Sequence, residues 1–177
     1  MLTEYIISET EKLADKYGTK DPYLICAARG IKIRRMDLKR KLKGYYFYMS
    51  RIENIVIDEN LPDIFCRILV AHELGHAVLH RRTAMMKGFT ELDIPLSYDK
   101  EDSMERDANL FAAELLLDDE EVASLLKEHT FFETASLLGV PAANVIVGGQ
   151  SSLQLMYDAI AKALLLGVYG GSKPWGK

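Results

Sequence analysis

Apolar residues recur every three or four positions at the start of the chain, the spacing that places them on one face of an α-helix. Residues 1–17 show this spacing, and Gly18 ends it. Asp21 and Pro22 are residue types preferred at a helix N-cap and at a first helical position. They predict a second, shorter helix that ends at Gly30.

The pattern then changes to short runs rich in Tyr, Ile, Val and Phe, which are typical of β-strands. The connection at residues 50–53 has the length of a hairpin turn, so we expect an antiparallel meander. The predicted strands are residues 31–36, 44–50 and 54–58. Together with the helices they predict an α+β fold built on a small antiparallel sheet.

Helical spacing returns after the strands. Residues 60–63 open a long apolar helix that reaches about His80. Residues 81–102 lack periodicity and are expected to form a loop, and loops of that length are usually functional or mobile. Ser103 is then the predicted N-cap of a strong helix over residues 104–117.

The last third of the chain carries two pairs of residues that resemble N-terminal capping boxes. Asp118 with Glu121 and Thr130 with Glu133 predict helices that run to about residues 127 and 139. Beyond them we expect three further segments: a short one from Pro141, an apolar helix capped by Ser152 that reaches Leu166, and a weakly ordered Gly-rich tail over 169–177.

Composition and charge restrict the class of protein. The chain has 177 residues with a formal net charge of −4, which argues against a nucleic-acid-binding protein. Residues 130–148 have a helix-turn-helix pattern, but residues 128–161 contain no Lys or Arg to contact phosphates. Without a signal peptide or an apolar run long enough to span a membrane, a cytoplasmic protein with reduced Cys26 and Cys66 is expected.

The long apolar helix contains His72-Glu73-Leu74-Gly75-His76, a His-Glu-x-x-His sequence. Four residues of helix turn just past a full circle, so both imidazoles project from one face and can bind one metal ion. Glu73 then stands beside the metal, where a general base takes a proton from water. Gly75 weakens the helix, and a close approach of substrate or of another backbone would explain its presence.

A catalytic zinc site needs a third protein ligand. The candidates are His80, His129 and the acidic residues of the 104–117 helix. His80 lies about 12 Å beyond His72 on the same helix and is better explained as a polar group at the helix C-terminus. His129 stands alone among capping residues and is explained in the same way.

Glu105 is better placed as the third ligand, because its helix neighbours Ala108 and Phe111 are apolar and predict a packed face. Asn109 follows one turn later on that face and could hydrogen-bond the free nitrogen of a liganding histidine. Asp107, by contrast, is explained as a solvated acid favoured by the helix dipole.

The His-Glu-Leu-Gly-His-Ala-Val-Leu-His sequence, followed by Glu-Arg-Asp-Ala-Asn-Leu-Phe-Ala-Ala-Glu-Leu-Leu-Leu from Glu105, resembles the ImmA/IrrE family of metallopeptidases. The resemblance covers most of residues 20–127. It implies a zinc ion on His72, His76 and Glu105, with Glu73 catalytic and Asn109 holding a ligand.

The resemblance implies a fold for the first part of the chain, and the helix-turn-helix pattern after it predicts a domain division. Residues 1–127 would form a zincin-like metallopeptidase domain with a zincin-type active-site helix, and 128–177 a small helical, helix-turn-helix-like subdomain. Family helices often read Glu-x-Glu-Ala-Asn, whereas Asp107 takes the place of the second acid here, and this departure favours Glu105 as the ligand.

The function implied by the resemblance is hydrolysis of peptide bonds in a helix-turn-helix transcriptional repressor, without direct contact to nucleic acid or membrane. The alternative is a non-proteolytic zinc-containing regulator that binds and sequesters a repressor. Glu73 separates the two, because a structural zinc site needs no acid at that position.

Two further features carry weaker expectations. Seven basic residues lie between Lys32 and Lys43, and we interpret them as a charged edge strand and turn rather than as a docking surface. In the strand over 44–50, alternate aromatic residues face opposite sides, and one side is a candidate wall of a substrate cleft. Tyr98 is a candidate for stabilising a tetrahedral oxyanion.

Overall fold

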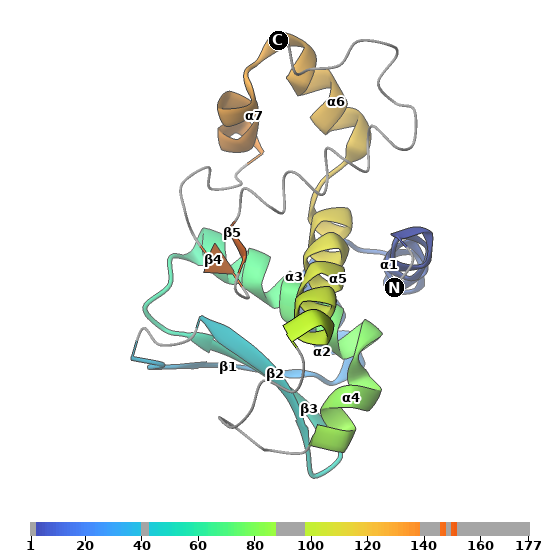
Figure 1. Ribbon diagram of the computed structural model, residues 1–177, viewed down its shortest axis with the longest axis vertical. Helices are drawn as coiled ribbons and strands as arrows, with labels where there is room; N and C mark the ends of the chain where they lie inside the picture. The colour runs from blue at the N-terminus through green and yellow to red at the C-terminus, as the bar shows by residue number, and fades with distance from the viewer. Residues whose placement is uncertain (1–2, 40–42, 88–97, 139–145, 148–149, 152–177) are drawn as a thin grey trace.

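The computed structural model describes residues 3–39, 43–87, 98–138, 146–147 and 150–151 (Figure 1). Its helices are α1 (Thr3–Tyr17), α2 (Pro22–Arg29), α3 (Asp63–Leu79), α4 (Arg81–Lys87), α5 (Tyr98–Leu116), α6 (Asp119–Glu128) and α7 (Phe131–Leu137). Its strands are β1 (Lys32–Met36), β2 (Gly44–Met49), β3 (Ile52–Asp58), β4 (Ile146–Val147) and β5 (Gln150–Ser151). The α+β class is confirmed. No helix among the described residues is long and apolar enough to cross a membrane.

The first helix ends at Tyr17, next to the predicted Gly18, and the second begins and ends at the residues that the sequence indicates. The Asp21 side chain accepts hydrogen bonds from the backbone N–H groups of Tyr23 and Leu24, which satisfies two donors at the start of α2. Gly30 ends α2 with φ 75°, a left-handed conformation that glycine adopts without steric cost. The predicted N-cap and helix end are therefore confirmed.

The three predicted strands are present within two residues of their expected ends, but their order corrects the predicted meander. The sheet has the order β1-β3-β2, with β2 antiparallel and β1 parallel to β3, so it is mixed. The most apolar run, Ile55-Val56-Ile57, takes the centre and is fully buried, whereas the basic β1 lies at an edge with Lys32, Arg34 and Arg35 exposed. Burial of apolar surface thus decides the order.

The helix α3 lies between the sheet and α5, as Figure 1 shows. It packs on β2, β3 and α2 on one side and on α5 on the other, and α1 packs against α5. This placement explains why α3 is apolar on nearly all sides. The largest fully buried side chains of the core come from all of these layers: Ile6, Ile25, Ile55, Ile57, Leu69, Leu74, Phe111 and Leu115.

The expected loop over residues 81–102 is wrong where the structure describes it. Residues Arg81–Lys87 form α4, a run of good helix formers, and Arg81 fixes this helix through an ion pair to Glu53 (3.2 Å) and a contact with the Tyr48 ring. The next helix, α5, begins at Tyr98, so Ser103 lies inside it and is not its N-cap. Residues 88–97 are outside the described part of the chain.

In the last third, the N-cap role of Asp118 and the capping box of Thr130 with Glu133 are confirmed, but no reciprocal bond from Glu121 is seen in the described part of the chain. Asp118 accepts hydrogen bonds from the N–H groups of Glu120 and Glu121 at the start of α6. Thr130 and Glu133 form the reciprocal box at the start of α7.

The second helix expected after Gly139 is wrong at Ile146–Val147, which pair with Gln150–Ser151 as two short strands. Residues 139–145 and the helix and tail expected over 152–177 lie outside the described residues. The division into domains at residue 127 therefore stays a prediction.

Gly75 is a point of close approach between α3 and α5. A Cβ atom placed there would lie 3.1 Å from the Ala108 Cα, 3.1 Å from the Phe111 Cδ1 and 3.2 Å from the Ala108 carbonyl oxygen. The predicted close approach is thus to another backbone. Ala108 stands one turn after Glu105, so the distance between the two helices sets how near Glu105 comes to α3.

We therefore predict that Gly75→Ala lowers the free energy of unfolding by about 1–3 kcal/mol, the usual cost of overpacking. The methyl group improves helix propensity by about 1 kcal/mol, which offsets part of that cost. Urea denaturation of wild type and variant measures the difference. A variant more stable than the wild type would show that the two helices separate without cost.

Candidate metal centre

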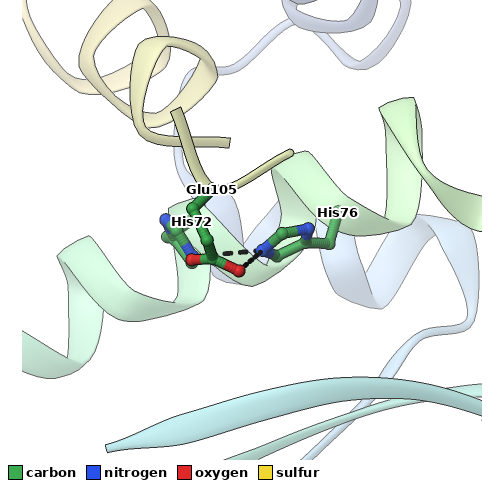
Figure 2. Close-up of side chains that lie close together, drawn as sticks. All are labelled: His72, His76 and Glu105. Atoms are coloured by element: carbon green, nitrogen blue, oxygen red, sulfur yellow. Dashed lines mark hydrogen bonds and ion pairs between the residues drawn. The ribbon is translucent and has the colours of Figure 1, made fainter. Parts of the chain in front are cut away.

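Three side chains from two helices converge in front of α3 (Figure 2). His72 and His76 project from one face of α3, with ring centroids 4.8 Å apart, and Glu105 reaches them from α5. The Nε2 atoms of the two rings are 3.2 Å apart. The Glu105 carboxylate oxygens lie 3.2 Å from the His72 Nε2 and 3.3 Å from the His76 Nε2.

These distances match the ligands of a tetrahedral metal ion. At metal–ligand distances of about 2.0–2.1 Å, tetrahedral angles place neighbouring ligand atoms about 3.3–3.4 Å apart. Among the residues that the structure describes, His72, His76 and Glu105 form a group whose donor atoms all lie within 4.8 Å of one another. The three residues suggested by the sequence are therefore the three that the fold brings together.

The contact of His72 with Asn109 orients the ring so that, in its neutral form, the Nε2 atom carries the lone pair. The His72 Nδ1 lies 2.8 Å from the Asn109 Oδ1, and both side chains are fully buried. An amide oxygen only accepts, so Nδ1 is the donor, and in a neutral ring Nε2 is then an acceptor. The Glu105 carboxylate is also an acceptor, and acceptors this close repel one another unless a proton or a metal cation lies between them.

The pKa shifts of the site also favour a positive charge at this point. Burial alone would raise the pKa of Glu105, but its contacts with the His72 and His76 rings outweigh burial and lower the value to about 2. Burial alone would lower the pKa of His72, but the contact with Glu105 and the charges of Glu73 and Glu105 raise it. A metal ion would supply this charge permanently.

Glu73 stands beside the convergence point and is only 4% exposed. Burial is the main cause that raises the pKa of its carboxyl group above the ordinary value, and the negative charge of Glu105 adds to it. The two histidines and a hydrogen bond from the backbone N–H of Tyr46 act in the opposite direction. A raised pKa makes the carboxylate a better proton acceptor near neutral pH.

One residue near the site was misjudged from the sequence, and the surroundings of a second were not predicted. His80 ends α3 as expected, but its ring is only 7% exposed, and its Nδ1 lies 3.1 Å from the Nδ1 of His76. Asp107 is 5% exposed instead of solvated, and its Oδ2 lies 3.5 Å from the His80 Nε2. The available signal was the i, i+4 spacing of His76 and His80, which continues the stripe of His72.

The remaining candidates have different outcomes. His129 is exposed at the end of α6, away from any described metal-ligand group. Tyr98 is the first residue of α5, and its side chain lies outside what the structure describes, so its proposed role stays a prediction. Tyr45 and Phe47 contact each other on β2, with ring centroids 5.6 Å apart, and both are half-buried.

We predict that the purified protein holds about one transition-metal ion per chain, as a site with three protein ligands does. His72→Ala and Glu105→Ala each remove one donor and should lose most of the bound metal. Elemental analysis of protein purified without added metal measures the content. His129→Ala is the matched control, because His129 is an exposed histidine. A ligand variant that retains the full metal content would remove that residue from the donor set.

We further predict that Asn109→Ala keeps the fold and weakens metal affinity by roughly 10–100-fold, the usual effect of losing a hydrogen bond to a ligand. The His72 ring then loses the acceptor that holds its Nδ1 proton. Competition with a chromophoric chelator measures the affinity, and circular dichroism checks the fold. Unchanged affinity would mean that α3 packing alone orients His72.

Comparison with known proteins agrees with this geometry. The sequence profile of the IrrE N-terminal-like domain matches residues 26–144, whereas a profile of aspartate amino-transferase matches only residues 120–177. The chain is 36% identical over 140 residues to uncharacterized immunity region protein 2 of Bacillus phage phi105, which spans 77% of this chain and 84% of the phage protein. No solved structure matches the chain.

A second relative is named for an enzyme activity. The chain is 32% identical over 125 residues to metallopeptidase ImmA of Bacillus subtilis (strain 168), which covers 67% of this chain and 69% of that protein. The matched profile includes α3 and α5 entirely, and therefore every residue of the candidate metal centre. The chain belongs to the ImmA/IrrE family of metallopeptidases.

Proposed function

We propose that the protein is a zinc-dependent metalloendopeptidase whose substrate is a helix-turn-helix transcriptional repressor. The observation that carries the proposal is the convergence of the two Nε2 atoms and the Glu105 carboxylate at 3.2–3.3 Å, with the buried Glu73 beside them. Two imidazoles and one carboxylate are a donor set typical of catalytic zinc, which keeps a fourth position open.

The residues around the centre fit the hydrolysis of a peptide bond. A zinc ion in this site would polarise a substrate carbonyl and lower the pKa of a water toward ~7. Glu73 accepts a proton from the attacking water as the oxygen bonds to the carbonyl carbon, and donates it to the nitrogen of the leaving amine as the C–N bond breaks. The raised pKa of Glu73 suits both transfers.

The position of β2 supports a peptide substrate. This strand lies at an edge of the described sheet, and the Tyr46 backbone N–H reaches Glu73, so the strand passes directly beside the proposed base. An extended chain placed along β2 would bring one of its peptide groups close to Glu73 and the metal ligands. Proteins commonly recognise extended peptides by adding them to a sheet edge.

The choice of repressor as substrate rests on the relatives. One relative is named for the immunity region of a phage and the other for a metallopeptidase, and the family resemblance links such proteins to a helix-turn-helix repressor. The alternative function, sequestration of a repressor without cleavage, gives no use to Glu73. Burying a carboxylate lowers the stability of a protein, and buried carboxylates with a raised pKa are concentrated at functional sites. The burial of Glu73 therefore favours catalysis.

We predict that Glu73→Gln abolishes cleavage of the repressor while metal content and fold stay intact. The amide is nearly isosteric but accepts no proton, and general acid–base catalysis contributes roughly 10²–10⁴-fold to a rate. The assay incubates the purified protein with the repressor encoded nearest to it and follows fragments on a gel. Glu120→Gln, the same change at an exposed position of α6, is the control.

Two outcomes would contradict the proposed function. Fragments formed equally fast by Glu73→Gln would exclude Glu73 as the proton acceptor. Release of the repressor from its operator DNA by wild type and variant alike, without fragments, would exclude proteolysis and favour sequestration.

Elemental analysis of the active protein identifies the metal, and an ion other than zinc would correct the proposed cofactor.

A further inference from the structure

The second histidine of the centre is held differently from the first. His72 donates directly to the amide of Asn109, whereas the Nδ1 of His76 faces another imidazole, that of His80, at 3.1 Å. The far nitrogen of His80 in turn faces the Asp107 carboxylate at 3.5 Å. His80 and Asp107 are both buried, at 7% and 5% exposure.

The contacts run from His76 to His80 and on to Asp107. Only one direction of hydrogen bonding along this series leaves His76 able to bind a metal. Between two Nδ1 atoms, one must donate and the other must accept. If His80 donated, a neutral His76 would carry its proton on Nε2, the atom that points at Glu105 and His72. That proton would block the metal. If His76 donates, its Nε2 keeps the lone pair.

Asp107 decides between the two directions. An ionised carboxylate only accepts, so the His80 nitrogen that faces it, Nε2, favours carrying the proton. The Nδ1 of a neutral His80 is then an acceptor, and it takes the hydrogen bond from His76. Among the described residues His80 Nε2 has no hydrogen-bond partner, so its contact with the Asp107 carboxylate at 3.5 Å has no competitor.

We propose that His80 and Asp107 are positioning residues that hold the proton of His76 on Nδ1 and so keep its Nε2 open for the metal ion. His80 comes from the end of α3 and Asp107 from α5. Asn109 holds the Nδ1 proton of His72 directly, and His80 does the same for His76 with Asp107 behind it. This inference rests on the proposed metal site.

The first test measures zinc affinity of the full chain by competition with a chromophoric chelator. His80→Leu replaces the ring with an apolar side chain of similar size and so removes the acceptor. It should weaken zinc binding by roughly 10–100-fold. His80→Asn places an amide oxygen near the former Nδ1 and should regain most of the loss. His129→Leu, at the exposed histidine, should bind like the wild type.

The second test reads the proton directly. Long-range ¹H–¹⁵N spectra of the metal-free protein at neutral pH distinguish a protonated from an unprotonated ring nitrogen. The wild type should show His76 with its proton on Nδ1. In Asp107→Ala the preference for one tautomer should weaken, and zinc affinity should fall with it.

Each result decides between positioning and packing. Wild-type affinity in His80→Leu, or equal losses in His80→Leu and His80→Asn, would overturn the proposal, because packing would then explain the effect. A wild-type His76 protonated on Nε2 would overturn it as well. If His80→Leu does not fold, the affinities of His80→Asn and Asp107→Ala and the tautomer of His76 still decide.

Failure of the proposed function gives a different pattern. A wild type that binds no zinc would contradict the metal centre itself, while the spectra would still show whether His80 accepts the proton of His76. A wild type that binds zinc and cleaves nothing would contradict the peptidase function alone.

Discussion

The close crossing of α3 and α5 at Gly75 is the constraint on which the rest of the structure depends. Side chains normally keep helix axes 8–10 Å apart, and the absence of one at Gly75 allows the Ala108 backbone to approach α3 directly. The candidate metal centre combines contacts across this junction with contacts inside α3, between His72 and His76 and between His76 and His80. Glu105, Asp107 and Asn109 come from α5, and their partners His72, His76 and His80 come from α3. The strands β2 and β3 pack against α3, and the backbone N–H of Tyr46 on β2 donates a hydrogen bond to Glu73.

Local signals allowed much of the fold to be predicted. Caps such as Asp21 and Thr130 bond to backbone groups two or three residues away, so their effect is contained in a few letters of sequence. The His-Glu-x-x-His spacing is equally local. The order of the strands was not predictable in this way, because it depends on which strand gains most from burial against helices far away in sequence.

The burial of Asp107 and the surroundings of His80 could not be predicted for the same physical reason. The sequence indicates that His76 and His80 share a face of α3, but whether that face meets water or a carboxylate depends on where α5 lies. Asp107 would be solvated on an isolated helix and is buried only because α3 covers it. Asn109 was predictable because it shares the face of Glu105, whose own partner could be inferred. Residues whose surroundings depend on a helix elsewhere in the chain need the tertiary structure.

Because the three candidate donor atoms lie on two helices, a metal ion bound by them would link the stability of this protein to the supply of metal in its surroundings. An ion that binds the folded chain and not the unfolded one acts as a removable cross-link between α3 and α5. At a free concentration a hundredfold above the dissociation constant, such binding adds about 2.7 kcal/mol to the free energy of unfolding. That is a large share of the total for a domain of this size. A cell that restricts its metal would then shorten the lifetime of the protein as well as its activity, because the chain without metal unfolds and is degraded more often.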